Sequence, residues 1–244
     1  MYNSPNEEDF ISGIHNYCDR WCERCQFTNR CSVFADERAY LEDGGSFEID
    51  EVVEKLTTIF ADTKQLLIEK AEELGIDPYA IDEEEFEAIR KREKQYVDDD
   101  ELSHLAERYW RSGREILEAD EAWLAELESE DKIEADVLAV LRWYLFFIPA
   151  KINRGLRGLL DDDGYEDRDQ ARDTQSDANG AIKIGLIAIE RSILAWTYLL
   201  DSDSSGKISP MIELLEKIKR LLESRFPFAR QFVRPGFDEI DAVM

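Results

Sequence analysis

All four cysteines of this 244-residue chain lie within the stretch YCDRWCERCQFTNRC, residues 17–31. Cys18, Cys22, Cys25 and Cys31 have the spacing C-x3-C-x2-C-x5-C. Cysteine thiolates are the usual ligands of structural zinc and of iron–sulfur clusters. The sequence therefore predicts a metal site made of these four side chains.

Helix geometry limits how this segment can be folded if it binds a metal. On a continuous helix the first three cysteines would lie, with His15, along one stripe. Cys18 and Cys25 would then be about 10 Å apart along the axis, whereas sulfurs around one zinc are about 4 Å apart. We therefore predict a helix that ends close to Cys22, followed by a loop that wraps the metal. Four thiolates close the coordination shell, which indicates a structural or electron-transfer site rather than a Lewis-acid catalyst.

The type of metal is indicated by a short resemblance. The ten residues CERCQFTNRC resemble the iron–sulfur loop of endonuclease-III-type DNA glycosylases, which also ends in C-x2-C-x5-C. The first gap has six residues in those enzymes and three here. The wide, uneven gaps favour a [4Fe–4S] cluster slightly over zinc, because zinc sites of four cysteines usually consist of two CxxC-like knuckles.

Two other interpretations of the cysteines remain open. Arg20, Arg24 and Arg30 lie among them and would lower the pKa values of the thiols, as in a redox switch. Reduced cysteines also serve as small apolar core residues.

Charged residues interrupt the two most apolar stretches, residues 135–150 and 182–200. These stretches are too short or too charged for membrane spans, and we expect buried core helices. Among the charges in or next to them, five are candidate functional residues: Lys151, Arg154, Lys183, Glu190 and Arg191. They are expected either to form ion pairs between helices or to line a pocket for a small anionic ligand.

Two further motifs are incomplete. Glu101 and His104 form an ExxH pair, but a di-iron bundle needs two such pairs and two more glutamates. The segment DSDSSGKIS, residues 201–209, resembles the first nine positions of an EF-hand loop, but Ile212 occupies the position of the bidentate glutamate. A helix start and a helix–helix turn explain these two motifs better than metal sites do.

The elements that must position these residues are helices. Glycine and proline are scarce, and apolar residues recur at steps of three and four. Helices are predicted from about residue 7 into the cysteine stretch and at about 33–41, 51–74, 83–97, 100–128, 132–158, 175–200 and 209–225. The predicted fold is all-α, an antiparallel up-and-down helical bundle with an N-terminal cysteine-rich metal-binding segment packed on it. We expect this segment to span residues 1–45, a helical connector residues 46–99 and the bundle core residues 100–244.

The net charge of the chain limits the classes of partner that it is expected to bind. The net charge is −26, which opposes binding to nucleic acid and favours a basic protein partner. The first ten residues lack the basic and apolar regions of a signal peptide, so we expect a soluble cytoplasmic protein in which the cysteines are reduced or bind metal. The sequence leaves the oligomeric state open.

Three longer segments, YCDRWCERC, WYLFFIPAKINRGL and DANGAIKIGLIAIERSILAW, resemble an uncharacterised family of acidic, helical bacterial proteins. This resemblance implies a shared fold and no activity. The sequence thus leaves three hypotheses: a metalloprotein with a closed four-cysteine site, a non-catalytic thiol-based regulatory or interaction protein with an acidic face, and an enzyme that holds a small anionic substrate in the bundle. Whether the protein is an enzyme is uncertain at this stage.

Overall fold

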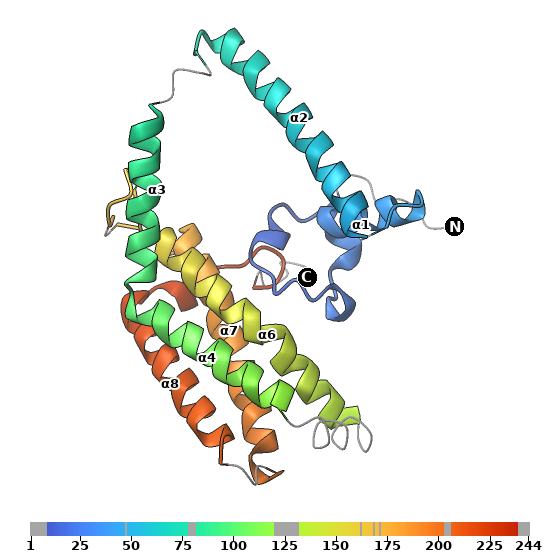
Figure 1. Ribbon diagram of the computed structural model, residues 1–244. Helices are drawn as coiled ribbons and strands as arrows, with labels where there is room; N and C mark the ends of the chain where they lie inside the picture. The colour runs from blue at the N-terminus through green and yellow to red at the C-terminus, as the bar shows by residue number, and fades with distance from the viewer. Residues whose placement is uncertain are drawn as a thin grey trace, which may run out of the picture. The chain divides into compact units, whose positions relative to one another are not determined.

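A computed structural model describes residues 9–46, 48–77, 82–119, 132–161, 163–167, 169–170, 172–202 and 206–238 (Figure 1). Over these residues the protein is all-α, as predicted, and contains one isolated β-bridge, Leu160 with Glu166. The helices are α1 (Ser32–Glu42), α2 (Ile49–Leu74), α3 (Glu83–Asp98), α4 (Glu101–Ala119), α6 (Lys132–Arg157), α7 (Asp177–Leu199) and α8 (Ile208–Arg225). No helix within the described ranges is both long and apolar enough to cross a membrane.

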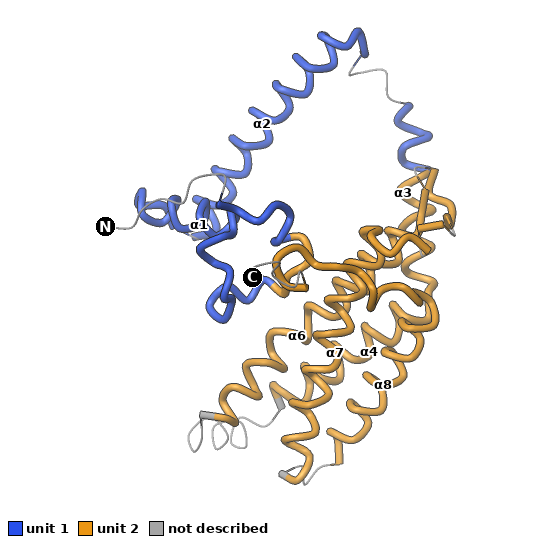
Figure 2. The backbone as a smooth tube through the Cα atoms, turned by 180° about the vertical axis from the view of Figure 1, so that it is seen from behind, with its two compact units in different colours: residues 1–15, 20–88 blue, residues 16–19, 89–244 orange. Residues whose placement is uncertain are grey.

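The chain forms two compact units, coloured blue and orange in Figure 2. Unit 1 comprises residues 1–15 and 20–88, and unit 2 comprises residues 16–19 and 89–244. The short stretch 16–19 therefore belongs to a different unit from the residues on either side of it. Among the cysteines, Cys18 lies in unit 2, and the other three lie in unit 1.

The core of unit 2 is formed by α4, α6, α7 and α8, which lie side by side in Figure 1. Helix α4 packs against α6 and α8, and α7 packs against the same two helices. Each helix contributes apolar side chains at steps of three or four, such as Leu138, Leu141, Tyr144, Ile148 and Ile152 of α6. This period places one face of each helix in the common core.

Two glycines allow close packing around α7. A Cβ atom at Gly158, just after α6, would lie 3.1–3.2 Å from backbone and side-chain atoms of Ala178. A Cβ atom at Gly180 would lie 2.4 Å from the ring of Tyr17 and 2.7 Å from that of Phe232. Side chains at these positions would therefore separate elements that now touch.

Unit 1 has very little core. Within residues 9–46 and 48–77, Ile14 is the single buried residue. Its first elements are the 3-10 turns Ile14–Asn16, Cys22–Arg24 and Thr28–Arg30. Helices α1 and α2 follow these turns. Asn16, at the end of the first turn, already belongs to unit 2. Helix α2 ends at Gly75, whose left-handed φ of 69° is the usual helix C-terminal conformation.

The prediction of an N-terminal helix is wrong. Residues 9–21 form bends, turns and the 3-10 turn Ile14–Asn16 rather than an α-helix. The stripe of His15 and three cysteines that such a helix would create is therefore absent from this segment. The physical reason lies in the stretch 16–19, which is held by contacts to α6 and α7 that a continuous helix would not make.

Candidate functional site

The cysteines occupy the edges of two 3-10 turns. Cys22 begins the turn Cys22–Arg24, and Cys25 follows it in an extended conformation. Cys31 follows the turn Thr28–Arg30, also in an extended conformation, and directly precedes α1. The backbone N–H of Cys25 donates to the carbonyl of Cys22 over 3.1 Å, and that of Cys31 to Thr28 over 3.4 Å. The same local structure, a 3-10 turn and then an extended cysteine, is thus formed twice.

None of the four cysteines forms a disulfide among the described residues, and all four are only half-buried. This exposure argues against their interpretation as ordinary core residues, which are usually fully buried. The backbone N–H of Phe27 donates to Sγ of Cys25 over 3.4 Å. Within the described ranges, no group of three or more His, Cys, Asp or Glu side chains has an arrangement that could hold a metal ion.

The residue after Cys18 is anchored strongly on α6 and α7. The carbonyl of Asp19 accepts a hydrogen bond from Trp143 Nε1 over 2.8 Å. Its carboxylate accepts one from the Tyr144 hydroxyl and one from Arg191, each over 2.8 Å. Burial, together with the hydrogen bond to Asp19, raises the pKa of Tyr144 to about 12, so its proton stays in place at neutral pH.

The residues before Cys18 are anchored by a second set of contacts. Arg154 Nε donates to Asp177 over 3.0 Å, and Tyr17 donates to the same carboxylate over 3.1 Å. Arg154 also reaches the carbonyl of Asn16 over 3.3 Å. The ring of Tyr17 lies on that of Phe232, with a centroid distance of 4.5 Å. Cys18 is therefore held between two anchored neighbours, and Arg20, which follows, adopts a left-handed φ of 59° that is rare for a residue with a Cβ.

The predicted pocket charges have partners on other elements. Arg154 pairs with Asp177 and Arg191 with Asp19, as described above. Lys183 pairs with Asp238 over 2.7 Å, and Glu190 pairs with Arg230 over 2.7 Å and with Lys219 over 3.4 Å.

The fifth predicted pocket residue, Lys151, lies 5.0 Å from the ring centre of Phe147. Lys151 also acts electrostatically on Asp177, the partner of Arg154. The five charges thus do not form one group, and neither of the two cavities described below is lined by them.

The structure also shows where the residues of the two incomplete motifs lie. Glu101 pairs with Lys217 of α8 over 2.6 Å, whereas His104 lines a cavity of about 340 Å³ with Trp110 and Asn153. In the EF-hand-like segment, residues 203–205 lie outside the described ranges, and α8 begins at Ile208.

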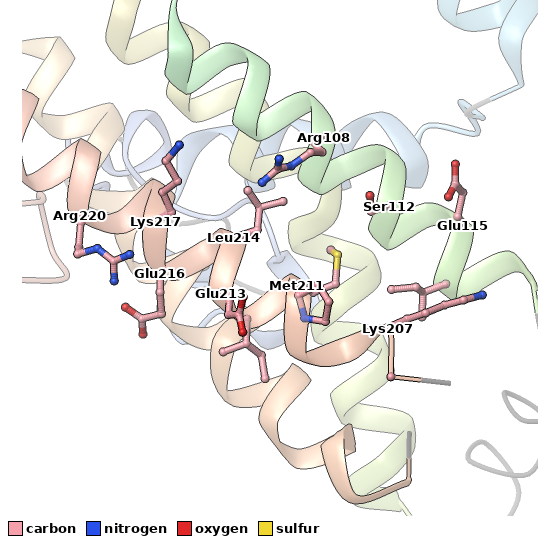
Figure 3. A pocket seen from close by; sticks show the side chains of 14 residues that line it. Arg108, Ser112, Glu115, Lys207, Met211, Glu213, Leu214, Glu216, Lys217 and Arg220 are labelled. Atoms are coloured by element: carbon pink, nitrogen blue, oxygen red, sulfur yellow. The ribbon is translucent and has the colours of Figure 1, made fainter. Parts of the chain in front are cut away.

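The largest cavity described, about 970 Å³, lies between α4 and α8 (Figure 3). Met211 and Leu214 of α8 supply apolar surface, and Arg108 reaches from α4 toward α8. Lys217 and Arg220 add positive charge from α8. Gly206 and Lys207 of the EF-hand-like segment also line this cavity. The sequence could not predict the cavity itself, because α4 and α8 are distant in the sequence and meet only on packing.

Comparison with known proteins assigns neither a family nor a function to the chain. No protein-family model matches the chain, and no curated protein or solved structure was found to be similar to it. The resemblances to the DNA glycosylase loop and to bacterial proteins therefore rest on their short motifs alone, and the function must be argued from the chemistry of the site.

Proposed function

We propose that the protein is a metalloprotein whose Cys18, Cys22, Cys25 and Cys31 bind a metal centre, with a [4Fe–4S] cluster favoured slightly over zinc. One observation carries this proposal: residues 9–46 hold four half-exposed thiols and a single buried residue, Ile14. Segments of about 40 residues without a core usually need a disulfide or a metal to be stable. A bound metal would supply the cross-link that the apolar side chains do not.

The local structure suits this role. Each 3-10 turn is tight, and the extended cysteine after it, Cys25 or Cys31, turns the chain out of the helical conformation. The Phe27 N–H donates to Sγ of Cys25, a contact that a bound thiolate could keep. Four thiolates leave no coordination position for substrate, so we assign the site a structural or electron-transfer role.

We also propose that α4, α6, α7 and α8 form an antiparallel up-and-down bundle that carries this segment. The closed ring of contacts among the four helices supports this arrangement. The anchoring of Asn16 and Asp19 on α6 and α7 supports an N-terminal segment that is attached close to its first cysteine.

The first prediction concerns metal content. Anaerobically purified protein should show broad absorbance near roughly 400 nm and contain about four irons per chain. Cys25→Ser should lose this signal, whereas Ser32→Ala, beside Cys31 but without a thiol, should retain it. Elemental analysis and visible spectra check both variants.

The other outcomes of this measurement are decisive. A colourless protein with one zinc per chain would show that the four-cysteine site binds zinc rather than an iron–sulfur cluster. A metal-free protein that is fully folded and forms a disulfide on mild oxidation would overturn the metal proposal in favour of a thiol switch. If the metal holds the segment together, a chelator should expose residues 9–46 to proteolysis and leave α4 to α8 intact.

A second candidate function is binding of a small anion with an apolar body in the cavity between α4 and α8. The observation that favours it is the pair Arg108 and Arg220, which line the cavity and have no ion pair among the described residues, although the chain carries 26 excess negative charges. Met211 and Leu214 line the same cavity and would contact the apolar body, whereas Lys217 is paired with Glu101.

This gives the second prediction. Arg108→Gln should weaken the binding of octanoate roughly tenfold, because one charge-assisted hydrogen bond is lost. Arg157→Gln, which removes an exposed arginine outside the cavity, should leave the affinity unchanged. Calorimetry measures both affinities. Equal weakening in the two variants would show that overall charge, rather than the cavity, attracts the ligand.

A further inference from the structure

Helix α2 carries a long apolar face that is exposed. The helix buries none of its 26 residues. Its apolar side chains recur at steps of four, three, four, seven and seven residues and are 45–72 % exposed: Ile49, Val53, Leu56, Phe60, Leu67 and Leu74. A contiguous apolar face of this size usually marks an interaction surface.

The spacing of this face indicates the shape of its partner. A helix of 26 residues is about 39 Å long, and residues at alternating steps of three and four form one nearly straight seam along it. Ile59 and Leu66, which are 46 % and 65 % exposed, widen the seam on one side. A straight apolar seam of this kind is complementary to the apolar face of another helix.

The charge of α2 indicates the chemistry of that partner. Between residues 49 and 74 the sequence has seven carboxylates and three lysines, so the polar part of the helix has a net charge of −4. The whole chain has a net charge of −26. A second copy of the same face would bring like charges together, whereas a basic partner would be attracted.

We propose that the apolar face of α2 docks a basic amphipathic helix of another protein. Phe60 and Leu67 lie near the middle of the seam and are 69 % and 65 % exposed, so they are its central apolar contacts. Lysine and arginine side chains that flank the partner's apolar face would lie against the carboxylates of α2. This surface does not depend on the cysteines, so the proposal stands apart from the metal site.

The test uses the full chain and a synthetic peptide of roughly 20 residues that forms an amphipathic Leu/Lys helix. The variant Phe60→Asp with Leu67→Asp should bind it about 30-fold more weakly, the effect of removing central apolar contacts. The matched control is Leu194→Asp with Tyr198→Asp on α7, where the side chains are 71 % and 48 % exposed. Both double variants add two carboxylates, so only loss of the apolar face separates them.

Each remaining outcome would contradict the proposal. Equal binding by the two double variants would mean that net charge alone attracts the peptide. A Leu/Glu peptide that binds as tightly would remove the role of charge. Sedimentation analysis that finds a dimer abolished by Phe60→Asp would identify a second copy as the occupant. A monomer that binds no peptide would leave the face covered by the chain itself.

Discussion

Asp238 is the acidic residue with the most complete set of partners near α7. Arg234 donates to it from its side chain over 2.8 Å and from its backbone N–H over 3.0 Å, and Lys183 pairs with it over 2.7 Å. All three side chains are at most 20 % exposed. Burial alone would raise the pKa of Asp238, but the hydrogen bonds from Arg234 and Lys183 outweigh it and hold the pKa far below the usual range.

The third prediction follows from this cluster. A carboxyl group whose pKa is lower in the folded state stabilises the fold above its unfolded pKa of about 3.9, and this contribution is lost as pH falls toward the folded value. Asp238→Asn should therefore lower the free energy of unfolding by about 2 kcal/mol at pH 7. The difference from wild type should shrink steadily below about pH 4.

Chemical denaturation over a pH series measures this difference. Asp62→Asn, which removes an exposed carboxylate of α2 with no ion pair among the described residues, is the matched control and should show no such dependence. A difference between Asp238→Asn and wild type that is constant with pH would show that the carboxylate is not the source of the stability.

The partners of individual side chains could be predicted from the sequence only in part. The sequence predicted that Lys183 and Glu190 either form ion pairs between helices or line a pocket. Glu190 does pair with Lys219 of α8, but Asp238 and Arg230, the other partners, lie in the segment after α8. The identity of these partners could not be predicted, because it depends on how the chain after α8 returns to α7. The anchoring of Asp19 was missed for the same reason, since its partners are more than 120 residues away in the sequence.

At the scale of elements, the packing of α7 against its neighbours depends on where its glycines lie. Gly180 faces the rings of Tyr17 and Phe232 at distances that no Cβ atom could occupy. Gly185, on the same helix, is also buried, but its nearest neighbour would be the Cβ of Lys151 at 3.4 Å.

The fourth prediction compares these two glycines. Gly180→Ala should destabilise the protein by roughly 1–3 kcal/mol, because overpacking exceeds the gain in helix propensity. Gly185→Ala should be neutral or stabilise by up to about 1 kcal/mol, since the propensity gain remains and the clash does not. Thermal denaturation measures both, and equal effects of the two substitutions would contradict the close approach at Gly180.

Helices were predictable where periodicity was strong. The expected helices at 132–158, 175–200 and 209–225 agree to within two residues with α6, α7 and α8 at both ends, because an apolar face with a period near 3.6 is repeated over many turns. The N-terminal helix was predicted wrongly because three- and four-residue steps of cysteines look like an apolar stripe. In the structure, side-chain contacts of Tyr17 and Asp19 determine the backbone there instead.

For the whole molecule, charge is the dominant property. A net charge of −26 on 244 residues means that carboxylates repel one another across the surface in the folded state. Exposed ion pairs, such as Arg114 with Glu118, offset only a little of this repulsion.

The fifth prediction is therefore that salt stabilises the protein. Raising NaCl from about 0.01 M to about 1 M shortens the screening length from about 30 Å to about 3 Å. We expect the unfolding temperature to rise by roughly 4 °C, which corresponds to about 1–2 kcal/mol for a chain of this size. Calorimetry at several salt concentrations tests this, and a falling midpoint would show that exposed ion pairs outweigh the repulsion.

The anchored stretch 16–19 has a consequence for the order of events during synthesis. Tyr17 precedes its partner Asp177 by 160 residues, and Asp19 precedes Arg191 by 172. These contacts can form only after most of α7 has left the ribosome, so closing this long loop is a late, non-local step. Until then the neighbouring cysteines are carried on an unanchored nascent chain, and they must be kept reduced, or take up the proposed metal, before the rest of the protein exists.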